Sequence, residues 1–148
     1  MNLEYTGSEA IDEAPDKVWA FITDPAKLGS CLPDVTDITV HDATTFDATV
    51  KVALGLVRGR LKFKLRLEPD QATRKLAVIA TGGGMGSAVD LTAHASVEPD
   101  GTGTKMDWDG AATMRGPMAA VGGRVLDAQA QKLISQTFAN VKAKVSAE

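Results

Sequence analysis

The apolar residues of the last third of the chain recur at steps of three and four, the spacing of an amphipathic helix with one buried face. Pro117 suits the first helical position, because it lacks the backbone N–H that would have no partner there. The pattern predicts one long helix within residues 116–148, roughly 43 Å long at about 1.5 Å per residue. Its apolar positions are Met118, Val121, Val125, Leu126, Leu133, Ile134, Phe138, Val141 and Val145.

Two adjacent glycines, Gly122 and Gly123, interrupt this pattern near its start. Each costs about 1 kcal/mol relative to alanine inside a helix. Either they allow the helix to pack closely on the rest of the fold, or they leave room for a ligand beside its first turns. The sequence leaves both interpretations open.

Between residues 35 and 114 the hydrophobic period changes to two, as in strands with one covered face. Residues 3–11 alternate in the same way, and Pro15 and Pro25 each mark the start of a short helix, the second with Asp24 as its N-cap. This order predicts an α+β fold in which a curved seven-stranded antiparallel sheet grips the C-terminal helix, and residues 1–148 form a single domain. The inward strand positions are Phe46, Ala48, Val50, Val52, Leu54, Leu61, Phe63, Leu65, Leu67, Leu76, Val78, Ala80, Val89, Leu91, Ala93, Ala95, Val97, Met106, Trp108, Gly110, Ala112 and Met114.

The turns of such a sheet alternate between two ends. One end receives polar turns at residues 41–45, 68–73 and 98–103. The other end, the apolar pole, receives glycine-rich turns, and methionine there suits a surface that adapts to varied apolar partners. We expect this pole to be a cavity mouth or a membrane contact, unless its side chains fold back and plug the core. They are Leu54, Leu56, Val57, Met85, Met114 and Met118.

Many inward positions carry alanine or glycine, so the interior is thinly filled. Close approach of the helix accounts for this, and so does an apolar cavity that opens at the apolar pole. The sequence does not choose between them.

Composition narrows the function classes. A net charge of −3 gives no indication of nucleic-acid binding. The single cysteine, Cys31, excludes an intrachain disulfide and favours a reducing compartment. We expect no signal peptide and no membrane span, hence a cytoplasmic location.

No catalytic constellation is visible. His41 falls in a turn and His94 on an outward strand position, and neither has the spacing of a metal site. Cys31 has no histidine near it in the sequence, so a packed small hydrophobe is the simpler interpretation. Residues 82–87 lack the Lys-Ser/Thr and the helix of a phosphate loop, and their glycines predict a mobile lid or bend. We expect neither an enzyme nor a metal site.

Five cations occupy alternate positions of one strand in a protein that is acidic overall. We call Arg58, Arg60, Lys62, Lys64 and Arg66 the basic stripe. It is either a solvated face that discourages strand pairing or a docking surface for an acidic partner or an anionic bilayer.

Three stretches of the sequence resemble the CoxG family of carbon monoxide dehydrogenase subunits, within the START/Bet v 1-like (SRPBCC) superfamily of helix-grip folds. They are PDKVWAFITDPAKLGSCLPDV, FDATVKVALGLVRGRLKFKLRL and GPMAAVGGRVLDAQAQKLISQTFANV. Asp34 stands where the family usually has glycine. The last stretch is the most specific, because it places family-like residues at Gly116, Pro117, Gly122, Gly123, Arg124, Leu126 and Phe138.

The resemblance implies a helix-grip domain with an apolar cavity that works beside a molybdenum hydroxylase such as aerobic carbon monoxide dehydrogenase, at the cytoplasmic membrane. It implies a respiratory quinone, menaquinone in actinobacteria, as cargo. Many family members carry a further C-terminal tail that helps to hold the membrane. This sequence ends soon after the long helix, so it is a short member, a truncated form, or one whose membrane contact rests on the apolar pole.

The leading hypothesis is a non-enzymatic carrier of menaquinone or a similar quinone or lipid, with Arg124 as a candidate for head-group contact. A structural recruiter of the dehydrogenase without cargo is the second. A small hydrolase or cyclase that uses an inward polar residue such as Tyr5 is the third, although the fold alone does not establish function. The predicted cavity lining is Phe46, Val50, Val52, Phe63, Leu65, Leu91, Trp108, Val121 and Val125.

Overall fold

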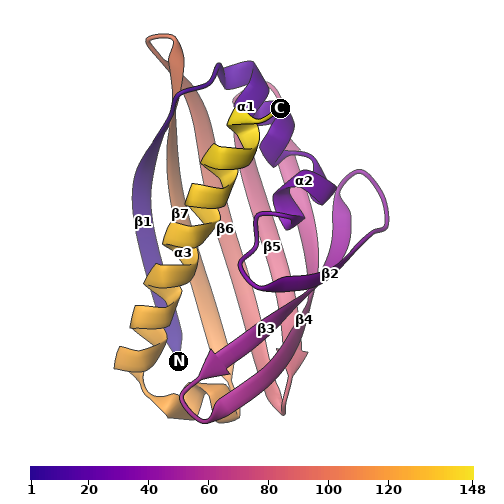
Figure 1. The fold of residues 1–148 in the computed structure, drawn as a ribbon, viewed down its shortest axis with the longest axis vertical. Helices are drawn as coiled ribbons and strands as arrows, with labels where there is room; N and C mark the ends of the chain where they lie inside the picture. The colour runs from indigo at the N-terminus through magenta and orange to yellow at the C-terminus, as the bar shows by residue number, and fades with distance from the viewer.

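The computed structural model describes residues 1–148 and shows an antiparallel sheet curved around one long helix (Figure 1). The predicted α+β architecture is confirmed. The helices are α1 (Pro15–Ile22), α2 (Pro25–Gly29), η1 (Pro117–Val121, a 3-10 helix) and α3 (Gly123–Ser146). The strands are β1 (Asn2–Ile11), β2 (Val35–Val40), β3 (Thr45–Leu54), β4 (Val57–Asp70), β5 (Lys75–Gly84), β6 (Ser87–Asp100) and β7 (Gly103–Arg115).

The sheet has the order β1-β7-β6-β5-β4-β3-β2, so β2 to β7 form a meander and β1 returns to pair with β7. The short helices α1 and α2 carry the chain from β1 at one edge to β2 at the other. Because every connection between β2 and β7 is a hairpin, successive turns alternate between the two ends of the sheet, as the sequence predicts.

The C-terminal helix differs from the prediction at its start. Residues 117–121 form a 3-10 turn, and α3 begins only at Gly123. Between them Gly122 has φ 103° and ψ 148°, a conformation that residues with a side chain rarely adopt. The single continuous helix was therefore wrong, because periodicity does not reveal a change in the sign of φ.

The far end of α3 is tied to α2. The Asn140 side-chain amide donates to the Cys31 carbonyl at 3.0 Å, and the Lys144 ammonium donates to the Ser30 carbonyl at 2.6 Å. These bonds satisfy carbonyls at the end of α2 that have no partner within that helix. They hold α3 across the sheet, with the chain terminus beside α1 (Figure 1).

Buried apolar side chains form two separate clusters rather than one core. The larger cluster joins α1, the strands and the end of α3, and includes Trp19, Phe46 and Val145. The smaller one gathers Leu54, Leu61, Val89, Met118 and Leu126 at the apolar pole. Part of the inner face of the sheet therefore lies between the two clusters.

Candidate functional site

The inner face of the sheet is only half-buried between the two clusters. Leu91 and Ala93 lie on β6, an interior strand, on the same face as the buried Val89 and Val97, yet solvent reaches both. On α3, Leu133 and Ile134 are likewise half-buried. Apolar side chains that face a helix and still meet solvent mark a region where sheet and helix do not close on each other. This inner region is the candidate site.

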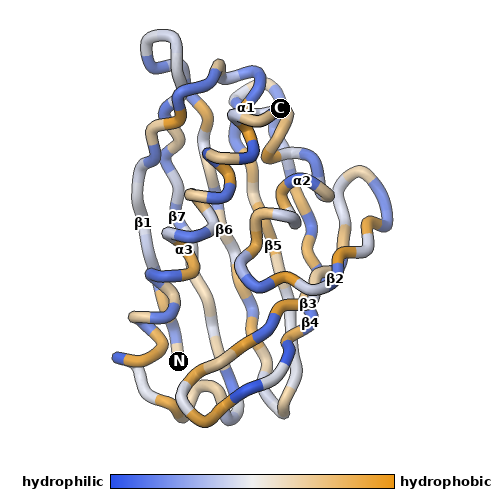
Figure 2. The backbone as a smooth tube through the Cα atoms, in the orientation of Figure 1, coloured by the Kyte–Doolittle hydropathy of each residue, from blue (hydrophilic) through white to orange (hydrophobic).

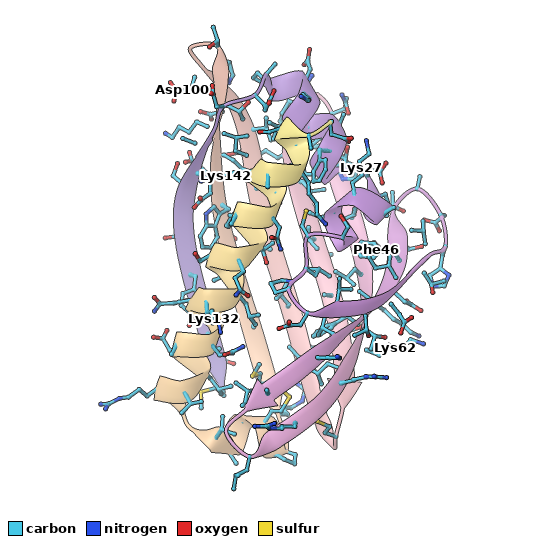
Figure 3. All side chains as sticks on the ribbon, in the orientation of Figure 1. Lys27, Phe46, Lys62, Asp100, Lys132 and Lys142 are labelled. Carbon is cyan, nitrogen blue, oxygen red and sulfur yellow. The ribbon has the colours of Figure 1, made fainter.

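Most of the predicted lining residues lie on this inner side. Phe46 and Leu65 belong to the larger cluster, and Phe46 packs beneath α2, where its Cε2 would lie 3.1 Å from a Cβ added to Gly29 (Figure 3). The other predicted residues are all half-buried, namely Val50, Val52, Phe63, Leu91, Trp108 and Val121. Trp108 packs on Phe138, and the rest contact one cluster or both. Their role in ligand binding stays a prediction.

Val125 does not belong to the predicted lining. Its side chain is 44% exposed, whereas the adjacent Leu126 is 2% exposed and belongs to the cluster at the apolar pole. The reason is the break at Gly122, because a 3.6-residue period continued through a 3-10 turn puts α3 in the wrong rotation. Arg124 is also exposed, at the first turn of α3.

Trp108 packs against α3 on the inner side of the sheet. Its ring lies 5.1 Å from that of Phe138 on α3, and the space for it comes from Gly7 on β1, its cross-strand partner. A Cβ at Gly7 would lie 2.6 Å from Trp108 Cζ2. The indole Nε1 is buried without a hydrogen-bond partner, whereas Nε1 of Trp19 donates to Gln71 at 2.7 Å. An unpaired buried donor costs about 1–3 kcal/mol.

One polar pair faces the inner region. The Tyr5 hydroxyl on β1 donates to the Asp127 carboxylate on α3 at 2.6 Å, and Gln131 donates to the other oxygen of that carboxylate at 3.0 Å. Burial, and then the bond to Asp127, raise the pKa of Tyr5 to about 12. Tyr5 was predicted as an inward polar residue, but nothing in the sequence pointed to Asp127, because the two residues are far apart along the chain.

The apolar pole is more closed than the sequence predicts. Leu54 and Met118 are 4% and 2% exposed, so they plug the end of the core and do not face solvent. Met85 folds inward too, since a Cβ added to Gly59 would collide with its Sδ. Leu56 alone is fully exposed, at 103%. Figure 2 shows the apolar colouring at the turn between β3 and β4.

This finding corrects two of the predicted mouth residues, Leu54 and Met118. Val57, Met85 and Met114 are half-buried against the smaller cluster. The Ser87 hydroxyl accepts from the Met118 amide at 3.0 Å and fixes η1 against β6. Leucine and methionine side chains at a glycine-rich turn fold inward here because a plugging cluster removes their surface from water.

All five residues of the basic stripe are exposed on the outer face of β4. Figure 3 shows Lys62 on the right-hand side of the molecule, away from Lys132 of α3. A sixth cation, Lys51 on β3, lies directly opposite Arg60 and was not part of the predicted stripe. The tight turn at Gly55 predicts that register, because pairing Leu54 with Val57 places residue 51 beside residue 60.

The candidate catalytic residues do not come together. Cys31 is buried, its Sγ lies 3.5 Å from the Lys27 carbonyl, and burial raises the pKa of the thiol, which disfavours the thiolate. His41 and His94 lie on the outer face in pairs with Asp47 at 3.1 Å and Asp109 at 2.8 Å. No group of three or more His, Cys, Asp and Glu is placed to hold a metal ion.

The fold defines the class, a START/Bet v 1-like helix-grip domain. The structure is similar to a conserved protein from Geobacillus kaustophilus, with a TM-score of 0.88 and 20% identity over 98% of this chain and 96% of that chain. It is also similar to the Zhui aromatase/cyclase from Streptomyces sp. R1128 (TM-score 0.72, 12% identity, 99% and 94% covered). A START superfamily protein from Mycobacterium smegmatis has a TM-score of 0.68 at 10% identity, with 97% of each chain covered. At such identities these likenesses show the fold alone.

A comparison of the sequence with models of known protein families establishes the family. The model of the CoxG family of carbon monoxide dehydrogenase subunits matches residues 7–146, and the chain belongs to this family. No curated protein matches the sequence significantly. No helix combines the length and apolar character needed to cross a membrane.

Proposed function

We propose that this protein is a non-enzymatic carrier of an apolar ligand, above all menaquinone or another respiratory quinone. The half-buried apolar surface between sheet and α3 carries the proposal. A ligand there covers Leu91, Phe63 and Trp108 and removes its own tail from water. At about 25 cal/mol per Å², burial of a few hundred Å² of tail offsets several kcal/mol of the cost of leaving a bilayer.

The unpaired Trp108 Nε1–H supports a ligand with a hydrogen-bond acceptor, such as a quinone carbonyl. Nε1 lies on the Gly7 side of the ring, 2.9 Å from where a Cβ on Gly7 would be, so the indole has to reorient before it can donate to a ligand. Arg124 was the predicted head-group contact, but its exposure on the first turn of α3 makes Trp108 the better candidate.

The proposed partner is a molybdenum-containing carbon monoxide dehydrogenase, and the proposed location is the inner face of the cytoplasmic membrane. Membership of the CoxG family supports the partner. The exposed Leu56 and the basic stripe support a membrane contact, since an apolar tip beside cations suits an anionic bilayer surface. The ligand enters where η1 meets the β3–β4 hairpin, which requires the smaller cluster to open.

Solvent extraction and mass spectrometry of the purified protein, before and after incubation with menaquinone-containing liposomes, test the carrier. We expect stoichiometric quinone in the wild type and at least a tenfold loss in Ala93→Phe, which fills the inner region. Val125→Phe is the matched control, because Val125 is exposed on α3, and it keeps its quinone. Quinone-free wild type after incubation contradicts the carrier.

A structural recruiter without cargo is the second candidate. The plug formed by Leu54 and Met118 at the apolar pole favours it, because a closed pole admits no ligand. Liposome sedimentation with the dehydrogenase separates the two functions. A protein that brings the enzyme to liposomes but extracts no quinone is a recruiter.

A further inference from the structure

A hollow of about 420 Å³ lies on the outer face of the sheet at the free end of the β3–β4 hairpin. Three cations line it, namely Lys51 from β3 and Arg58 and Arg60 from β4. Asp34 is the only carboxylate in the lining, so the hollow has a formal charge of +2. Val52 and Gly59 border the hollow too, but its three cations alternate with them along the strands and so project from the opposite face of the sheet to the inner region.

The pairing of β3 with β4 brings the three cations of the hollow together. Arg60 lies directly opposite Lys51, and Arg58 lies opposite Ala53, whose small side chain leaves space between the cations. Like charges directly opposite each other in an antiparallel pair destabilise the sheet. Elsewhere along the basic stripe the partners are Thr49, Asp47 and Thr45, so the repulsive pair is confined to the hollow.

Like Lys62 and Lys64 further along the basic stripe, the cations of the hollow lack the ion-pair partners that several other surface charges have. Arg66 pairs with Glu68 at 3.5 Å, and Arg115 pairs with Asp90 at 3.1 Å. Lys51, Arg58 and Arg60 take part in no ion pair. A bound anion would relieve the repulsion between them, and two guanidinium groups on one strand face suit the tetrahedral oxygens of a phosphate.

The neighbouring turn indicates where this phosphate comes from. Leu56 is fully exposed two residues before Arg58, in the turn that joins the two strands. A free phosphate offers nothing to an apolar side chain, whereas a phospholipid surface offers an anionic head group and, just beneath it, an apolar layer. The cationic hollow matches the anionic head group, and the exposed Leu56 matches the apolar layer beneath it.

We propose that the hollow formed by Lys51, Arg58 and Arg60 binds the phosphate of an anionic phospholipid and that Leu56 enters the bilayer beside it. This site rests on the proposed membrane contact but not on quinone binding. It orients the hairpin, and with it the junction with η1, toward the membrane.

Sedimentation of the full chain with vesicles of phosphatidylcholine, alone or mixed with phosphatidylglycerol, tests the site. The variant Lys51→Gln/Arg58→Gln/Arg60→Gln removes the hollow's cations. Lys62→Gln/Lys64→Gln/Arg66→Gln is the matched control, because it removes three cations from the same strand face. We expect the first variant to lose roughly tenfold more affinity for the anionic vesicles than the control. Equal losses would overturn the site and leave a diffuse stripe.

Two further measurements identify the ligand. NMR titration of the wild type with inorganic phosphate should shift the amide signals around residues 51–60, and Leu56→Ser should keep these shifts but lose vesicle binding. Phosphate shifts without any vesicle binding by the wild type would overturn the lipid assignment. Vesicle binding that needs the hollow's cations supports the site even if liposome incubation yields no quinone, an outcome that rejects only the carrier.

Discussion

Tyr5 is the only tyrosine of the chain, so its ionisation is measurable without interference from other phenols. We predict a pKa of about 12 in the folded protein, against about 10 after unfolding. Because the folded-state pKa is the higher one, this contribution to stability is complete below pH 10 and is lost as the pH rises toward 12. Absorbance titration of the phenolate, with and without urea, checks the shift.

Asp127→Asn separates the two causes of that shift. Burial remains in this variant, but the negative acceptor is gone, so the Tyr5 pKa should fall without reaching the unfolded value. An unchanged pKa would show that Tyr5 does not donate to Asp127 in solution.

Gly7 and Gly110 differ in how much room an added methyl group would have. A methyl group at Gly7 collides with the Trp108 ring at 2.6 Å, whereas at Gly110 its nearest neighbour is the Ala93 Cβ at 4.0 Å. We predict that Gly7→Ala destabilises the fold by about 1–3 kcal/mol. Gly110→Ala should be neutral or mildly stabilising, and urea unfolding of both variants measures the difference. Similar losses would mean that the inner region is already filled.

The element that departs most from local rules is the junction of η1 and α3. Gly116, with φ 94° and ψ −164°, and Gly122 flank a single 3-10 turn, and no side chain caps α3. The Gly122 carbonyl accepts the first helical bond from the Leu126 amide at 3.1 Å. The junction is thus set by backbone geometry, which makes it the natural place for the pole to open.

Adjacent glycines should respond in opposite ways. Gly122→Ala forces an alanine to a φ of 103° and should cost about 1–3 kcal/mol. Gly123→Ala lies in the first turn of α3 with its nearest atoms 3.8 Å away, so it should be neutral or stabilising by up to about 1 kcal/mol. Denaturant midpoints of the two variants test this, and a stable Gly122→Ala would favour a continuous helix in solution.

At the scale of the whole molecule, charge is divided across the outer face of the sheet. On β6 and β7 the carboxylates of Asp90, Asp107 and Asp109 are each paired with a basic side chain of the same two strands. Cations without an ion pair gather instead on β3 and β4, namely Lys51, Arg58, Arg60, Lys62 and Lys64. A molecule with a net charge of −3 can therefore still bind an anionic surface through one side.

This division predicts a strong effect of salt. Vesicle binding should weaken steeply between low salt and about 1 M NaCl, where the screening length falls from roughly 10 Å at 0.1 M to about 3 Å. Uptake of quinone from detergent should change little, because burial of an apolar tail does not depend on charge. Salt-insensitive vesicle binding would point to Leu56 alone as the membrane contact.

The succession of elements could be predicted from local patterns. The alternation around Phe63 and Leu91 reflects the strand period, and Pro15, Asp24 and Pro25 mark helix starts by their own backbone chemistry. The candidate site could be predicted only in part. Small inward residues such as Ala93 indicated a thinly filled interior, but Val125 was predicted to line the cavity and Leu54 to form part of its mouth.

What the sequence determined by itself is what depends on neighbours within a few residues: strand period, helix caps, tight turns and the basic stripe. What only the tertiary structure decided depends on partners far apart along the chain. Tyr5 meets Asp127 across 122 positions, and the apolar pole closes because Met118, Leu54 and Val89 arrive from three elements. Burial depends on which elements pack together in the folded chain. The hydrophobic period of a helix or strand therefore shows which residues share a face, but not whether another element covers that face.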